Sequence, residues 1–225
     1  MTVIVVAIAV AGIVCFALGA GWGAKSGRTG KIDSLTGATG RKDALRHLDA
    51  LLRRPRQGDY VVGVAFCDVD GLKDVNDTHG HAVGDDVLKH VAERLRHALR
   101  PSDVVARLGG DEFLVICDGV RARSDMDRIA LRLREAMSPA ILIDNALVGA
   151  DQHGLVAVYA SISIGTAASD GATTGSAELI ERADRAMYYG KRIRQEMPTD
   201  HGPPSPLRLK NRRFLEDEPV GEIVA

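Results

Sequence analysis

The sequence predicts an α/β (α+β) domain, in which helices cover a mostly antiparallel sheet, preceded by one transmembrane helix. Amphipathic segments at helical spacing alternate with valine-rich apolar runs that are typical of buried strands. Two such runs, Val104–Leu108 and Phe113–Cys117, flank Gly109 and Gly110 and predict an antiparallel hairpin at the centre of the sheet. An uncharged segment near the start of the chain, Thr2–Ala24, predicts the membrane helix.

Composition limits the classes of function. The chain of 225 residues can hold one domain of ordinary size with appendages. Its 29 basic and 30 acidic residues are nearly balanced, which argues against nucleic acid as a partner. Its three cysteines, Cys15, Cys67 and Cys117, are an odd number in apolar surroundings, so neither a disulfide framework nor a zinc site is expected.

The uncharged N-terminal segment is followed by basic residues, beginning with Lys25 and Arg28. By the positive-inside rule, the residues after the helix are expected in the cytoplasm. We therefore predict a membrane anchor over residues 1–24 and a short juxtamembrane linker over residues 25–32; a buried core helix is the alternative. Gly19 and Gly23 end a stripe of small residues that would let two membrane helices pack closely, but the abundance of alanine and glycine also produces this spacing by chance.

A helix and a buried strand follow the linker. Arg41–Arg54 carries apolar residues at helical spacing and stops before Pro55. Tyr60–Cys67 is almost continuously apolar, as expected of a strand covered on both faces. Asp68 and Asp70 come next, where carboxylates either bind a ligand at the end of a strand or belong to a solvated turn.

A polar stretch containing Lys73 and Asn76 leads into a helix that is expected to end near Leu99. Asp85 and Asp86 are expected in its first turn, where the helix dipole favours carboxylates. The alternative is recognition of guanine, because one carboxylate can accept both the N1–H and the exocyclic N2–H of that base. Asn76 would complete the contacts with the base edge.

The next elements are a helix and two strands. Ser124–Met137 is expected to be helical, with its first residue and Asp127 forming a capping pair. Strands are expected over Ile141–Val148 and Leu155–Ile164, the second of them closed by Gly165.

The last predicted helix extends from Ser176 to about Arg194. Lys191 and Arg194 near its end either cap the helix or hold phosphate groups. Residues 197–225 are rich in proline and charge and lack periodicity, so this tail is expected to be disordered.

The central hairpin carries the strongest chemical signal. Gly109 and Gly110 leave the backbone without a Cβ, and Asp111 and Glu112 follow directly. Bare backbone beside two hard oxygen ligands suits a metal-bound phosphate.

Taken in order, the motifs resemble those of the GGDEF-domain diguanylate cyclases. The matching segments are Asp33–Gly37, Asp68–Asp85, Gly109–Phe113, Ser163–Gly165 and Ala183–Tyr188. The resemblance covers residues 33–196, which are therefore expected to be a GGDEF domain. It implies a fold similar to the catalytic domain of nucleotidyl cyclases and to the palm of polymerases.

The resemblance also implies roles for individual residues. Asp68 and Asp111 would hold Mg²⁺ (or Mn²⁺), assisted by the Val69 carbonyl and Glu112. Either Asp111 or Glu112 would be the catalytic base, and the choice between them stays open. The remaining substrate contacts implied are guanine recognition by Asn76 and Asp85, phosphate neutralisation by Lys73 and Lys191, and close approach of the nucleotide to Gly109 and Gly110.

The implied reaction condenses two GTP molecules into cyclic di-GMP and two pyrophosphates. Because each domain binds one GTP, a homodimer is required. Arg100 and Asp103 match the family's RxxD product-inhibition site at the usual spacing before the glycines. With the anchor, the resemblance implies a single-pass protein of the bacterial cell membrane with its catalytic domain in the cytoplasm.

Three positions depart from the family pattern. Leu72 replaces a phenylalanine, and Gly40 replaces an asparagine. Gln195 stands where the family has an arginine and carries no charge. Arg194, three residues after Lys191, shares a helix face with it, so we expect triphosphate binding to be weakened rather than abolished. The alternative function is therefore a catalytically weak or inactive GGDEF module that binds GTP or cyclic di-GMP and signals by contact.

Overall fold

The computed structural model describes residues 32–55, 60–121, 123–144, 155–169 and 174–196. The chain divides into two units, residues 1–30 and 31–225, and all elements below belong to the second. The predicted anchor, nearly all of the predicted linker and the predicted disordered tail lie outside the described residues. Within the described ranges, no helix is long and apolar enough to cross a membrane.

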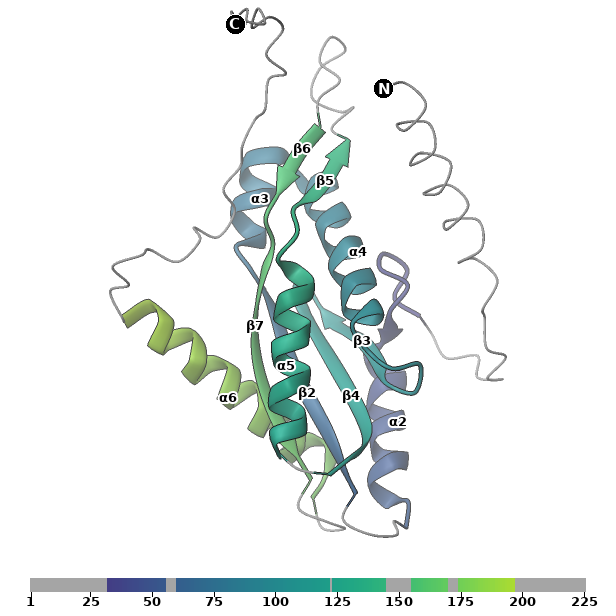
Figure 1. Cartoon of the computed structure of the whole chain (residues 1–225). Coiled ribbons are helices and arrows are strands. Elements are labelled where there is room, and N and C mark those ends of the chain that lie inside the picture. Colours follow the sequence, from purple (N-terminus) through teal and green to yellow (C-terminus); the bar gives the residue numbers. More distant parts are fainter. Residues whose placement is uncertain (1–31, 56–59, 122, 145–154, 170–173, 197–225) are drawn as a thin grey trace, which may run out of the picture. The chain divides into compact units, whose positions relative to one another are not determined.

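A five-stranded mixed sheet forms the centre of the domain, in the order β1-β3-β4-β2-β7. The strands are β1 (Thr39–Gly40), β3 (Val104–Gly109), β4 (Glu112–Val120), β2 (Val61–Asp70) and β7 (Ser161–Ala168). β1 pairs with β3 in parallel, and the other three pairings are antiparallel. The mostly antiparallel sheet and its central β3–β4 hairpin are thus confirmed (Figure 1).

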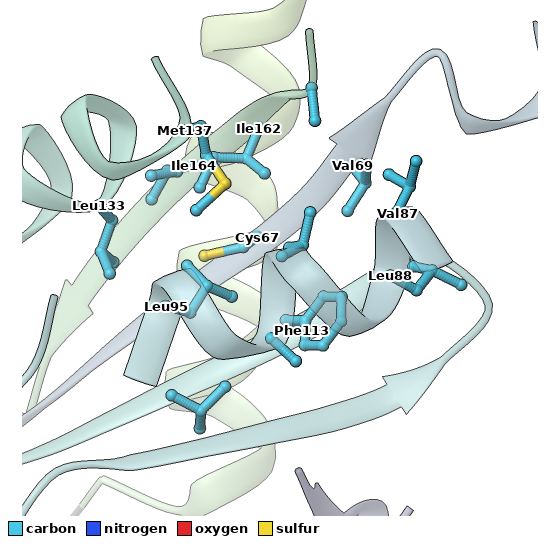
Figure 2. Packing of buried hydrophobic residues seen from close by; sticks show 14 of the residues in the cluster. Cys67, Val69, Val87, Leu88, Leu95, Phe113, Leu133, Met137, Ile162 and Ile164 are labelled. Carbon is cyan, nitrogen blue, oxygen red and sulfur yellow. The ribbon is translucent and has the colours of Figure 1, made fainter. Parts of the chain in front are cut away.

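Helices cover both faces of this sheet. The helices are α2 (Arg41–Arg53), α3 (Leu72–His79), α4 (His81–His97), α5 (Arg123–Met137) and α6 (Ser176–Glu196). The apolar part of β2 is covered on both faces: Val64 and Phe66 pack with α2 and α6, while Ala65 and Cys67 pack with α4 and α5. Figure 2 shows Cys67 on the face of the sheet covered by α4 and α5, beside side chains of α4, α5 and β7.

The predicted strand over Leu155–Ile164 is in fact two strands. β6 (Leu155–Val158) pairs with β5 (Ile141–Asp144) in a separate two-stranded sheet, whereas β7 pairs with β2. The chain changes partner at Tyr159 and Ala160. The sequence stays hydrophobic through Tyr159 and Ala160, so hydrophobicity alone did not reveal the break between the two strands. Hydrogen bonds from the hydroxyls of Ser161 and Ser163 to Asp70 fix the start of β7.

The prediction that Gly165 closes a strand is wrong, because this residue lies in the middle of β7. A Cβ at this position would come within 2.1 Å of both the Ala183 carbonyl oxygen and the Met187 backbone nitrogen. Glycine is therefore required because α6 packs directly on the strand.

We expect Gly165→Ala to lower the free energy of unfolding by about 2 kcal/mol, because α6 must move away from the sheet. Urea denaturation measures this change. The matched control is Gly190→Ala, since Gly190 lies in α6 with nothing within 4 Å of an added Cβ. That substitution should stabilise the helix by about 1 kcal/mol; an equal loss in both variants would contradict the packing argument.

Two helix starts also differ from the predictions. α4 begins at His81, so Asp85 and Asp86 lie beyond its first turn and the helix-dipole interpretation of them is wrong. At the start of α5, the carboxylate of Asp125 accepts the backbone N–H of Arg121 at 2.8 Å. Asp127, which was expected in the capping pair, is exposed.

Candidate active site

Asp68 lies in β2, and Glu112 and Asp111 lie at the start of the neighbouring strand β4 and in the turn before it. Asp68 of β2 stands opposite Glu112 of β4 in the antiparallel register. The backbone N–H of Val69 donates to the main-chain carbonyl of Asp111 at 3.1 Å, which ties the turn to the end of β2. The structure therefore brings together the four residues that the sequence predicted as metal ligands.

Asp70 lies at the same end of the sheet. The sequence allowed two interpretations of this residue, a ligand-binding carboxylate or part of a solvated turn. Its carboxylate accepts hydrogen bonds from the hydroxyls of Ser161 at 2.9 Å and Ser163 at 2.6 Å. The guanidinium of Arg194 donates to the Ser163 hydroxyl at 3.0 Å. Arg194 thus reaches this edge of the sheet, as its proposed part in phosphate binding requires.

Lys191 lies directly against the carboxylates. Its ammonium group is 2.6 Å from Asp68 Oδ1 and 3.7 Å from Asp70 Oδ1. Partial burial opposes the charge on Lys191, but the hydrogen bond to Asp68 and the charges of Asp68, Asp70 and Asp111 outweigh it and raise the pKa of the lysine. Lys191 is therefore held as a cation at the site.

The pKa of Glu112 reflects the negative charges of the neighbouring carboxylates. Burial raises the pKa of Glu112, and the charges of Asp111, Asp68 and Asp184 raise it further, with Arg41 opposing them. Such mutual repulsion is what a bound cation relieves.

These residues fit a divalent metal ion in their chemistry. Carboxylate and carbonyl oxygens are the ligands that Mg²⁺ and Mn²⁺ prefer. Among the described residues, no three His, Cys, Asp or Glu side chains are already grouped closely enough to surround an ion. The Lys191 ammonium contacts Asp68 Oδ1 at 2.6 Å, and because a carboxylate has two oxygens with about four acceptor sites, this contact does not prevent Asp68 from binding a metal ion.

The glycine turn leaves its backbone open. Gly109 has φ 149° and Gly110 has φ 52°, and nothing lies within 4 Å of a Cβ added to either. A side chain that the sequence did not single out secures the turn: Arg107 donates to the Gly110 carbonyl at 3.0 and 2.7 Å and to Asp33 at 3.2 Å. The entry motif at Asp33 is thereby connected to the turn.

Asp33 has a lowered pKa, with a testable consequence. Burial raises the pKa, but hydrogen bonds from the hydroxyl and backbone N–H of Thr36, together with Arg107, outweigh it. A carboxylate with a lowered folded pKa stabilises the fold above its unfolded value and loses that effect as the pH falls through the folded value. Asp33→Asn should therefore destabilise the protein at about pH 6, with the difference shrinking below its ordinary pKa of 3.8.

Urea unfolding of both proteins across this pH range measures the effect. A difference that stays constant down to about pH 3 would show that the Asp33 charge contributes nothing.

The residues predicted to recognise guanine come from two consecutive helices. Asn76 lies in α3 and is half-buried, and Asp85 lies in α4 and is exposed. A Cβ on Gly84 would be 1.9 Å from the Asn76 side-chain oxygen, so Asn76 packs against the residue next to Asp85. Lys73, in the first turn of α3, is exposed to solvent, where an incoming phosphate can reach it.

The predicted product-inhibition residues form a separate turn between α4 and β3. The backbone N–H of Arg100 donates to Asp103 Oδ2 at 3.1 Å, and that of Asp103 donates to the Arg100 carbonyl at 3.0 Å. Burial raises the pKa of Asp103, while the Arg100 backbone hydrogen bond and the charges of Arg100 and Arg132 oppose the rise. Arg132 of α5, which the sequence did not reveal, therefore belongs to the surroundings of this turn.

Comparison with known proteins identifies the family. Residues 30–197 match the model of the family described as "Diguanylate cyclase, GGDEF domain". The chain belongs to this family.

Among curated relatives, the chain is 36% identical over 159 residues to the response regulator PleD of Caulobacter vibrioides, a match that covers 71% of this chain and 33% of PleD. It is 38% identical over 160 residues to the diguanylate cyclase TpbB of Pseudomonas aeruginosa, covering 71% of this chain and 35% of TpbB. The chain therefore matches about a third of the length of each of these relatives.

Solved structures give the same result. The GGDEF domain of PA1120 (YfiN or TpbB) from Pseudomonas aeruginosa matches with a TM-score of 0.62 at 36% identity, covering 70% of this chain and 92% of that one. The GGDEF domain of DgcB from Caulobacter crescentus, solved in complex with c-di-GMP, matches with a TM-score of 0.62 at 28% identity, covering 74% and 92%. The fold is that of a GGDEF domain.

Proposed function

We propose that this chain is a membrane-anchored diguanylate cyclase that condenses two GTP molecules into cyclic di-GMP and two pyrophosphates. The observation that carries the proposal is the placement of Asp68 opposite Glu112, next to Asp111 and the open glycine turn, with Lys191 held against Asp68. Relatives that bear the name diguanylate cyclase support the same activity.

Each group in the site has a part in the reaction. Asp68, the Val69 carbonyl, Asp111 and Glu112 would hold Mg²⁺ or Mn²⁺, which when bound supplies positive charge for the triphosphate and the departing pyrophosphate. Further contacts to GTP come from Lys73, Lys191 and Arg194 at the phosphates and from Asn76 and Asp85 at guanine. The 3′-hydroxyl of one GTP attacks the α-phosphate of the other, and Asp111 or Glu112 accepts the proton.

Catalysis of this kind requires two domains face to face, each with its own GTP. In this proposal the N-terminal segment anchors the chain in the bacterial cell membrane, keeps the domain in the cytoplasm and favours the dimer. We expect the specific activity of the purified full chain to rise with protein concentration. Pyrophosphate release at a series of concentrations tests this; a specific activity independent of concentration in a chain shown to be monomeric would refute catalysis by a dimer.

A second candidate is a GGDEF module that binds GTP or cyclic di-GMP without turnover. One observation favours it: Gln195 carries no charge where the family has arginine. The two functions differ in a direct way, because the module would bind GTP but release no pyrophosphate.

We further propose that Arg100 and Asp103 bind the product and inhibit the enzyme. Arg100 is exposed, and a guanidinium can contact guanine or phosphate through two hydrogen bonds. Arg100→Ala should raise the yield of cyclic di-GMP and weaken product inhibition about tenfold, because one charged contact is lost. The fold should survive, since the turn is held by main-chain atoms of Arg100.

Progress curves with added cyclic di-GMP measure the inhibition. Arg46→Ala, which removes an exposed arginine from α2, is the control for lost charge. Equal inhibition of the wild type and Arg100→Ala would remove this part of the proposal.

A further inference from the structure

A pocket lined by arginines lies at the other end of the β2–β7 pair from the carboxylates. Val61 at the start of β2 lines it, and it therefore lies roughly 20 Å along the strand from Asp68. Its volume is about 520 Å³, which is in the range of small-molecule sites. The rest of its lining comes from β7, α5, α6 and the residues next to them, and includes Arg121, Arg123, Arg182, Arg185 and Tyr189.

Arginines are prominent among the residues that line the pocket. Four of its lining residues are arginines, and none of those that the structure describes is acidic. Arg121 lies over the ring of Tyr60, 5.0 Å from its centroid, and Arg121 Nε donates to the hydroxyl at 3.0 Å. This contact orients the Arg121 guanidinium.

Two other arginines are exposed at the pocket. Arg185 pairs with Glu181, and their side chains are 62% and 67% exposed, so water screens this ion pair and an anion can compete for the guanidinium. Arg123 is the first residue of α5, where the helix dipole is positive and disfavours a cation. An anion bound between Arg123 and Arg185 would gain from both guanidinium groups and from this helix end.

An aromatic ring lines the same pocket. Tyr189 is 58% exposed, although tyrosine rings usually bury much of their surface. Its face can stack on a planar base, while the arginines suit phosphate groups. Ala167 and Ala168 of β7 also line the pocket, and their small side chains leave room between the arginines and Tyr189.

We propose that this pocket binds a nucleotide, with the phosphates at Arg121, Arg123 and Arg185 and the base at Tyr189. The site is separate from the carboxylate cluster and does not depend on the diguanylate cyclase activity. The two sites share one element, since α6 supplies both Arg185 to the pocket and Lys191 to the carboxylates.

Calorimetric titration of the full chain with ATP, in the absence of GTP and divalent metal, tests the proposal. We expect Arg123→Gln with Arg185→Gln to weaken ATP binding about tenfold or more. The matched control, Arg46→Gln with Arg128→Gln, removes two exposed arginines elsewhere and should bind ATP like the wild type. Lys73→Met with Lys191→Met, which removes two of the three phosphate contacts proposed for the first site, should also keep this binding.

The titrations with ATP would overturn the proposal in three ways: no ATP binding by the wild type, an equal loss in the test and control variants, or loss of all ATP binding in the lysine variant. Inorganic tripolyphosphate is the probe for the base: it should bind more weakly than ATP, and Tyr189→Ala should remove the difference. Equal affinity of the wild type for the two ligands would refute the nucleotide assignment. Thermal unfolding of each variant confirms that it is folded.

Discussion

Asp111→Asn should lower the rate of cyclic di-GMP formation by at least ~1000-fold. The substitution removes one of the carboxylates proposed to hold the metal ion and a candidate catalytic base. The fold should be unchanged, because the Asp111 contact that ties the turn to β2 is made by its main-chain carbonyl, which asparagine retains. Pyrophosphate release and chromatography of the nucleotides measure the loss.

Asp127→Asn is the matched control, since Asp127 is exposed on α5, outside the carboxylate cluster. It should turn over GTP like the wild type. If Asp111→Asn retained more than about a tenth of the activity, Asp111 would be neither a required metal ligand nor the base.

Lys191→Met should lower kcat/KM for GTP by about 10- to 100-fold, the effect of losing one charged hydrogen bond. If Lys191 neutralises the triphosphate, most of the loss should appear in KM. A purely structural role, through its ion pairs with Asp68 and Asp70, would instead lower stability and kcat together. Steady-state kinetics and urea unfolding on the same preparations separate these two roles.

Lys89→Met is the control for Lys191, because Lys89 is an exposed lysine that pairs with Asp86 on α4. It should leave both kinetic constants unchanged. An unchanged KM in Lys191→Met, or an equal change in both variants, would contradict the role of Lys191 at the phosphates.

Much of the fold could be predicted because its elements have strong local signals. Arg41–Arg53 has a clear helical period and a proline beyond its end, and β2 is apolar because both of its faces are covered. The division of Leu155–Ile164 was missed because hydrophobicity continues while the strand partner changes. The early start of α4 was missed because Gly80, with φ 82°, separates two helices within a stretch that has few apolar residues.

The candidate site was predictable where its motif is contiguous and not where it depends on tertiary contacts. Asp111 and Glu112 are adjacent in the sequence, and their setting between two glycines and a strand was informative. Asp70 accepts a hydrogen bond from Ser161, which is 91 positions away in the sequence. Arg107 donates a hydrogen bond to Asp33, from which it is separated by 74 positions. Arg132 approaches Asp103 only because α5 packs on the sheet. No local pattern encodes such contacts.

The most direct test is whether the full chain makes cyclic di-GMP. Purified protein at high concentration is incubated with GTP and Mg²⁺, and the nucleotides are separated by chromatography. A cyclic di-GMP peak that is absent from Asp111→Asn is the predicted result and would make Gln195 a tolerated change. GTP binding in calorimetry without any cyclic di-GMP, even from a chain that is crosslinked as a dimer, would contradict the enzyme and identify a binding module.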